Sequence, residues 1–147
     1  QRDHELGDPV CNCLSGSASH QKLSDHQCGC ATGSMENTIL PGDRFIGNRL
    51  AYVFGEPERG DIVVFRYPDD ESEIYVKRVI GLPGDTIEVK EGALYVNDVR
   101  QDEPYIAEPY ILQDFARVTV PEDCYFVMGD NRNNSMDSRD PPWAHPL

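Results

Sequence analysis

A serine and a lysine far apart in the sequence could together perform nucleophilic catalysis. Ser34 lies in the stretch ATGSMENTILPGD, where a Gly-rich turn leads into alternating apolar residues. A serine hydroxyl is a weak nucleophile and needs a base to accept its proton. The four histidines lie in the polar segments at the two ends of the sequence, outside the expected strands. Ser34 is therefore either a turn residue or a nucleophile with a base other than histidine.

Lys77 is the candidate base, because it interrupts the apolar stretch EIYVKRVIG. Strand alternation puts it on the same face as Tyr75 and Val79. From this strand alone, a lysine at a sheet edge or one that extends to water is the more common explanation. A buried lysine would instead have its pKa lowered by desolvation, and its neutral amine could accept a proton from a serine.

A third stretch, MGDNRNNSMDSR at 128–139, gathers carboxylates, guanidinium groups and a serine after a strand-like run. It could be a surface turn with Asx hydrogen bonds. It could also orient the lysine and join neighbouring loops through charge-assisted hydrogen bonds. The residues concerned are Asp130, Arg132, Ser135, Asp137 and Arg139.

The elements that must position these residues are short strands. The sequence has 12 glycines and 11 prolines, and they separate short apolar runs. We expect strands within 44–54, 60–68, 73–81, 85–98 and 117–130, with irregular loops between Asn97 and Asp114. The range 85–98 reads as a hairpin that turns at Glu91-Gly92. The sequence thus predicts a mainly β fold of coiled antiparallel sheets, barrel-like in shape.

Composition divides the sequence into three parts and excludes some function classes. Residues 1–30 are polar and expected to be a flexible flank, 31–139 a compact domain, and 140–147 a Pro-rich tail. The net charge of −13 argues against a nucleic-acid partner, because phosphate binding needs concentrated Lys and Arg. No apolar run exceeds five residues, whereas a membrane-spanning helix needs about 20.

The cysteines of the N-terminal flank suggest a different function. Cys11 and Cys13 form one Cys-x-Cys pair, and Cys28 and Cys30 form a second. Four thiolates could bind a tetrahedral zinc ion, although loose or oxidised thiols are the favoured interpretation. The fifth, Cys124, begins an apolar run and is expected to be a small core residue.

Four stretches occur in an order that resembles the type I signal peptidases, in their compact Gram-positive-like form. They are TGSMENTILPGD, GDIVVFRYP, YVKRVIGLPGD and GDNRNNSMDSR, and the resemblance covers 31–139. It implies a membrane-bound Ser-Lys endopeptidase without cofactors. Such an enzyme removes signal peptides from secretory preproteins, cuts after small residues, and places its catalytic domain on the extracytoplasmic side of the cell membrane.

The resemblance also implies a role for each matching residue. Ser34 is the expected nucleophile and Lys77 its general base, while Thr32 and the Ser34 backbone N–H form the oxyanion hole. Ser135 is expected to hydrogen-bond and position the lysine. The expected supporting ion pairs involve Arg78, Asp130, Asp137 and Arg139. The aspartates of three Gly-Asp turns match the motifs but are expected to shape loops: Asp43, Asp61 and Asp85.

Both flanks differ from the family pattern, which leaves a second function class open. The family has a membrane helix immediately before Thr32 and closing strands after Arg139. Here the segment before Thr32 is polar and contains cysteines, and the segment after Arg139 reads DPPWAHPL. The alternative is a non-enzymatic domain, either an impaired peptide-binding derivative or a domain that binds a metal through four cysteines. A self-cleaving repressor is disfavoured, since no DNA-binding helix pair or basic patch is present.

Overall fold

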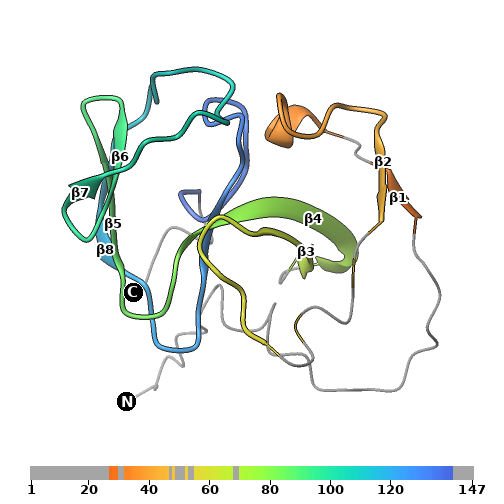
Figure 1. Cartoon of the computed structure of the whole chain (residues 1–147), viewed down its shortest axis with the longest axis horizontal. Coiled ribbons are helices and arrows are strands. Elements are labelled where there is room, and N and C mark those ends of the chain that lie inside the picture. Colours follow the sequence, from red (N-terminus) through yellow and green to blue (C-terminus); the bar gives the residue numbers. More distant parts are fainter. Residues whose placement is uncertain are drawn as a thin grey trace, which may run out of the picture.

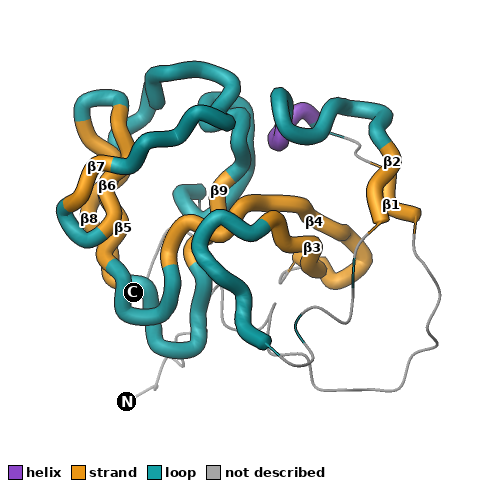
Figure 2. Tube along the Cα trace, viewed as in Figure 1, coloured by secondary structure: helices purple, strands orange, loops and turns teal. Residues whose placement is uncertain are grey.

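The fold consists of short antiparallel strands around the long strand β4 (Figure 1). The computed structural model describes residues 27–29, 32–46, 48, 52, 55–67 and 70–140. Within these residues helix is limited to one 3-10 turn, η1 (Figure 2). The elements are β1 Gln27–Gly29, η1 Gly33–Met35, β2 Arg44–Ile46, β3 Ile62–Tyr67, β4 Asp70–Gly81, β5 Thr86–Lys90, β6 Ala93–Val96, β7 Val99–Arg100, β8 Phe115–Thr119 and β9 Phe126–Met128.

The strands form three sheets, with orders β1-β2, β3-β4-β9 and β7-β6-β5-β8. All pairings are antiparallel, so the predicted mainly β, antiparallel fold is confirmed. In the described part of the chain the strands belong to separate sheets and not to one closed barrel. Figure 1 shows β4 curving from beside β3 toward the sheet of β5 and β8.

Two apolar cores lie along β4, and the strand contributes to both. The smaller core contains Val79 with residues of β3 and β9, and Tyr75 packs against it. The larger core contains Ile80 with residues of β5, β6 and β9. Successive residues of a strand point to opposite faces, which is how neighbours on one strand serve two cores. Gly81 ends β4 against the larger core, where a Cβ would approach the Ile87 and Val120 side chains to 2.8 and 2.9 Å.

The predicted hairpin at Glu91-Gly92 is confirmed by the pairing of β5 with β6. Both turn residues have positive φ, 51° and 76°, as a two-residue type I′ turn requires. A second such turn, at Asn97 (φ 51°) and Asp98 (φ 66°), joins β6 to β7. The sequence predicts only irregular loops in this region. It gives no sign of β7, because that strand has only two residues, both exposed, and shows no apolar alternation.

Three turns share one structure, in which a glycine of positive φ precedes an aspartate that closes the turn. The aspartate carboxylate accepts the backbone N–H of the residue three positions earlier, and the aspartate N–H donates to the carbonyl of that same residue. The pairs are Asp43 with Leu40 at 2.9 Å, Asp61 with Glu58 at 3.0 Å, and Asp85 with Leu82 at 2.6 Å. The glycines are Gly42, Gly60 and Gly84, with φ of 93°, 97° and 80°. The prediction that these aspartates shape loops is confirmed.

The N-terminal boundary of the fold differs from the predicted one. β1 lies inside the segment 1–30 that was expected to be a flexible flank, and its backbone pairs with β2 in the register Gln27↔Ile46. The sequence gives only a weak signal for β1, because a strand of three residues is too short to show apolar alternation. Residues 1–26 and 141–147 lie outside the described residues. Among the described residues, no helix is long and apolar enough to span a membrane.

Candidate active site

Ser34 and Lys77 meet at the junction between η1 and β4. Lys77 Nζ donates a hydrogen bond of 2.9 Å to Ser34 Oγ across 43 positions of sequence. Both side chains are buried, with 7% exposure for Ser34 and 4% for Lys77. The prediction that the amine lies within hydrogen-bond reach of the serine is therefore confirmed.

Burial of Lys77 follows from its position in the central strand of a sheet. β4 lies between β3 and β9, and Lys77 is opposite Val63, which is 1% exposed. Its Nζ is 5.2 Å from the centre of the Tyr75 ring. The common explanation, an edge lysine that extends to water, is thus wrong for this residue. Burial disfavours the charged form of an amine, while a ring face favours it modestly.

The 3-10 turn that carries Ser34 is held by hydrogen bonds from the 128–139 loop. Asn131 N–H donates to the Ser34 carbonyl at 3.0 Å, and Asn131 Nδ2 donates to the Gly33 carbonyl at 3.0 Å. Behind the turn, Met35 is fully buried and its carbonyl accepts two N–H groups. Asn131 was not among the predicted site residues, although it lies within the GDNRNNS stretch.

Thr32 lies beside the pair but its hydroxyl is directed at the serine. Thr32 Oγ1 donates to Ser34 Oγ at 3.3 Å. The residue has extended backbone (φ −129°, ψ 155°) immediately before η1. Ser34 Oγ therefore faces two donors, the amine of Lys77 and the hydroxyl of Thr32.

Ser135 is close to the pair but does not make the expected hydrogen bond. Its Oγ is buried and has no hydrogen-bond partner among the described residues, so the expected bond to Lys77 is not formed in this structure. The hydroxyl instead lies over Gly129, where a Cβ would collide with Ser135 Oγ and the Ser34 carbonyl oxygen.

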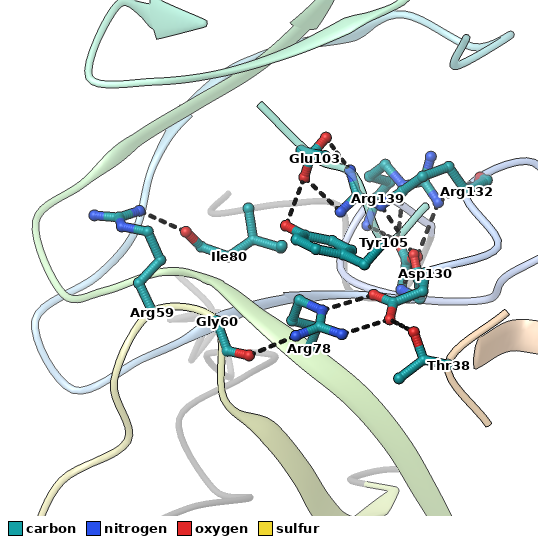
Figure 3. Close-up of polar contacts among 12 residues, drawn as sticks. Thr38, Arg59, Gly60, Arg78, Ile80, Glu103, Tyr105, Asp130, Arg132 and Arg139 are labelled. Atoms are coloured by element: carbon teal, nitrogen blue, oxygen red, sulfur yellow. Dashed lines mark hydrogen bonds and ion pairs between the residues drawn. The ribbon is translucent and has the colours of Figure 1, made fainter. Parts of the chain in front are cut away.

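Partly buried Arg78 and fully buried Asp130 form an ion pair on the other face of β4, one of those that the family resemblance implied. Arg78 Nε and Nη2 donate to the two carboxylate oxygens at 2.8 and 2.6 Å. Asp130 is fully buried and also accepts the Thr38 hydroxyl (Figure 3). The hydrogen bond to Asp130 raises the pKa of Arg78 more than burial lowers it, so the guanidinium stays charged. The ion pair thus joins β4 to the segment after η1.

Asp137 and Arg139 form the second expected ion pair. Arg139 Nε and Nη2 each donate to an oxygen of Asp137 at 2.8 Å. Asp137 also accepts the Gly129 N–H at 3.0 Å, and Arg139 Nη2 donates to the Arg132 carbonyl at 2.8 Å. Burial alone would lower the pKa of Arg139, but Asp137 raises it. Both ends of the 128–139 loop are therefore tied together.

Two further residues were missed because they lie in the irregular 97–114 region. Nη1 and Nη2 of Arg132 each donate to one carboxylate oxygen of Glu103, both at 2.7 Å. Tyr105 donates its hydroxyl to Glu103 at 3.0 Å, and its ring centre lies 4.0 Å from the Arg78 guanidinium carbon. Burial and the charge of Glu103 raise the pKa of Tyr105 to about 12. No periodic signal marks this segment.

The predicted cysteine site lies almost entirely outside the described residues. Cys11, Cys13 and Cys30 are not described, and of Cys28 the structure describes the backbone alone. Among the described residues no group of three or more His, Cys, Asp or Glu side chains could hold a metal ion. Cys124 is buried in the larger core, which confirms its predicted place.

Comparison with known families gives one assignment over most of the chain. Residues 24–144 match the family described as signal peptidase, peptidase S26. The matched range extends past both ends of the predicted 31–139 domain.

Individual relatives give the same result. The chain is 46% identical over 112 residues to a probable signal peptidase I-2 of Synechocystis, a match that covers 73% of this chain and 51% of that protein. It is 47% identical over 116 residues to signal peptidase I S of Bacillus subtilis, with 72% and 61% covered. A crystal structure of a signal peptidase I from Enterococcus faecalis superposes with a TM-score of 0.53 at 37% identity, covering 61% of this chain and 88% of that one. The chain thus spans between half and two thirds of the length of these two curated relatives.

Proposed function

Because the chain belongs to the signal peptidase family, peptidase S26, we propose that it is a serine endopeptidase that removes N-terminal signal peptides from exported proteins. Ser34 is the nucleophile of this proposal and Lys77 the general base. The observation that carries the assignment is the buried hydrogen bond of 2.9 Å between Lys77 Nζ and Ser34 Oγ. A non-enzymatic role has no comparable support in the described residues.

The reaction follows from the two side chains. Neutral Lys77 accepts the proton of Ser34 as Oγ attacks the carbonyl carbon of the scissile peptide bond. The resulting tetrahedral intermediate collapses when protonated Lys77 gives the proton to the leaving amine, and the C–N bond breaks. Water then attacks the acyl-enzyme, with the lysine again accepting a proton, and releases the signal peptide. Burial of the amine favours the neutral form that the first step needs.

The oxyanion would be bound by the Ser34 backbone N–H and the Thr32 hydroxyl. Thr32 Oγ1 lies 3.3 Å from Ser34 Oγ, within reach of a carbonyl oxygen under attack after a small rotation of its hydroxyl. One such donor typically contributes about 3–4 kcal/mol to transition-state stabilisation. The substrate would bind as an extended strand with small side chains near the cleavage point, a mode that uses backbone hydrogen bonds for affinity.

The site of action is also part of the proposal. By family membership, the domain would act at the cell membrane, on its extracytoplasmic side, where signal peptides emerge. Its partners would be the signal peptides of secretory preproteins.

Cleavage of a peptide with an Ala-x-Ala motif tests the proposal. We expect the wild-type chain to cut after the second alanine, and Ser34→Ala to abolish the cut while retaining the β-rich circular dichroism spectrum. The rate should rise with pH as the lysine loses its proton. Equal cleavage by wild type and Ser34→Ala, or none by either, would contradict the proposed function.

A further inference from the structure

Glu103 lies in an irregular loop, yet both of its carboxylate oxygens are engaged in a buried network (Figure 3). Its side chain is 5% exposed and that of Arg132 is 0% exposed. A fully buried guanidinium needs a charged partner, because removing the partner leaves an uncompensated charge. Glu103 is that partner, and it also accepts the Tyr105 hydroxyl at 3.0 Å.

Arg132 connects Glu103 to the backbone around Ser34. Its Nε donates to the Gly129 carbonyl at 2.9 Å and fixes the turn at 129–132. Asn131, within the same turn, donates its N–H to the Ser34 carbonyl at 3.0 Å. The carboxylate of Glu103 is thus linked to the nucleophile's own carbonyl through one side chain and one turn.

Tyr105 connects the same network to the strand that carries the lysine. Its ring lies against the Arg78 guanidinium at 4.0 Å and is 6.0 Å from that of Arg132. The ring therefore lies near two cations, each of which has its own carboxylate, Asp130 or Glu103. Figure 3 shows Tyr105 between Glu103 and Arg78. Two residues further along, Ala107 N–H donates to the Asp130 carbonyl at 3.0 Å.

We propose that Glu103 and Tyr105 form a brace, a pair of positioning residues that fixes the 129–132 turn and through it the backbone of Ser34. In this proposal the two residues act through Arg132 and Arg78 and not on the reacting atoms or the substrate. It holds the backbone around Ser34, whose N–H is the expected oxyanion donor, in the orientation that attack requires. The expected effect of the brace on cleavage rests on the proposed function, whereas its expected effect on the 129–132 turn does not.

The chemistry of the pair suits this role better than general packing does. Burial and the charge of Glu103 raise the pKa of Tyr105 to about 12, so the hydroxyl remains a donor at any physiological pH. A bidentate arginine–carboxylate pair fixes an angle as well as a distance. A rigid orientation matters because a displacement of about 1 Å can lower an enzymatic rate by about 100-fold.

Two variants test the brace. Glu103→Gln keeps the shape but removes the charge, and Tyr105→Phe keeps the ring on Arg78 while removing the hydroxyl. We expect kcat for the Ala-x-Ala peptide to fall by about tenfold or more in Glu103→Gln and by a smaller factor in Tyr105→Phe. KM should stay within about twofold, and the midpoint of the pH–rate profile should not move, because the proposed brace acts on neither the substrate nor Lys77.

Amide hydrogen exchange provides a readout that a merely structural role would not reproduce. The Asn131 N–H, bonded to the Ser34 carbonyl, should exchange about tenfold faster in Glu103→Gln through local opening. The Val120 N–H donates to the Asp85 carbonyl at 2.8 Å in the larger core and reports global unfolding, so its exchange should rise by a smaller factor than that of Asn131. Equal acceleration at both amides would indicate global destabilisation and overturn the brace.

Matched substitutions elsewhere are the controls. Glu88→Gln removes a glutamate whose ion pairs with Lys90 and Arg117 are exposed, and Tyr95→Phe alters a half-buried tyrosine of β6. Both should leave kcat and the Asn131 exchange unchanged. Unchanged exchange in Glu103→Gln would overturn the brace even if activity fell. An inactive wild-type chain would contradict the proposed function, whereas the exchange data would still decide the brace.

Discussion

Lys77 and Arg78 are adjacent in β4 and hold two ends of the same short segment. Lys77 bonds to Ser34 Oγ at 2.9 Å, while Arg78, on the other face, binds Asp130, which accepts the Thr38 hydroxyl. The segment from Ser34 to Thr38 is thus fixed at both ends by consecutive residues of one strand. A shift of β4 along its axis would disturb both contacts together.

Lys77 should be indispensable for cleavage but not for folding. Lys77→Met should abolish activity and retain the fold, because methionine is similar in length and tolerates burial. Lys77→Arg should also be inactive, since a guanidinium does not lose its proton in this pH range. Peptide cleavage and thermal unfolding measure the two effects. Activity in either variant would show that another group accepts the proton of Ser34.

Ser135 should matter for activity and not for stability. Its buried hydroxyl has no hydrogen-bond partner in the described part of the chain, so Ser135→Ala should leave the free energy of unfolding unchanged or raise it by up to about 1 kcal/mol. Cleavage should slow if the hydroxyl turns to Lys77 during the reaction, as the role implied by the family resemblance requires. Undiminished kcat in Ser135→Ala would remove Ser135 from the proposed machinery.

Ser138 offers the matched control for that measurement. Its hydroxyl is also buried, but it accepts the Val127 N–H at 3.0 Å. Ser138→Ala should therefore lower the free energy of unfolding by about 1–3 kcal/mol, because a buried donor loses its partner. Urea unfolding of both variants distinguishes the two serines.

Gly129→Ala should inactivate the site. A Cβ at this position would collide with Ser135 Oγ and with the Ser34 carbonyl oxygen, and the second of these is backbone that cannot rotate away. We expect a loss of about 1–3 kcal/mol of stability from overpacking, with cleavage reduced far more than the folded fraction. Gly33→Ala is the comparison, since its Cβ would meet only side-chain atoms at 3.3 and 3.9 Å. Equal cleavage by the two variants would refute the contact.

Asp130→Asn should be the most destabilising of these changes. Asp130 is fully buried and pairs with Arg78, whose guanidinium would lose its counter-charge. Breaking a buried ion pair by removing one partner costs about 3–5 kcal/mol. Chemical denaturation measures the loss, and Glu88→Gln, in an exposed pair, should change stability by less than about 1 kcal/mol. A similar small change in Asp130→Asn would show that the turn relaxes around the neutral side chain.

Asp85 should make stability depend on pH in the acid range. Burial alone would raise the pKa of this carboxyl, but bonds from Leu82 N–H and Asn97, with the charge of Arg59, lower it below its usual value. A lowered folded pKa gives stability that is present above the unfolded value of about 3.9 and is lost as pH falls through the folded value.

The pH dependence of Asp85→Asn checks this sign. The variant should be less stable than wild type at pH 7, and the difference should shrink below about pH 4. Urea unfolding at several pH values gives the two curves. Exposed Asp114→Asn should show no such convergence. A difference that stays constant with pH would mean that the hydrogen bonds, and not the charge, supply the stabilisation.

The sequence by itself determined the local features of this protein. The apolar runs on either side of Gly-Asp turns specified β3 to β6, and the three aspartates close their turns with backbone N–H groups three residues away. Such features depend on neighbours in sequence, whose geometry is set by φ, ψ and strand alternation. The order of four motifs also identified the family, because several ordered motifs rarely occur together by chance.

Tertiary structure alone decided which polar residues act together. From the sequence of its strand alone, Lys77 is most simply explained as an exposed lysine. Only the placement of β4 between β3 and β9 buries it against Ser34. Glu103 and Tyr105 carry no periodic pattern, and their partners Arg132 and Arg78 lie far along the chain in opposite directions. The Ser135 hydroxyl was expected on the lysine but lies over Gly129. Hydrogen bonds between distant side chains depend on the packing of whole strands, which no local pattern encodes.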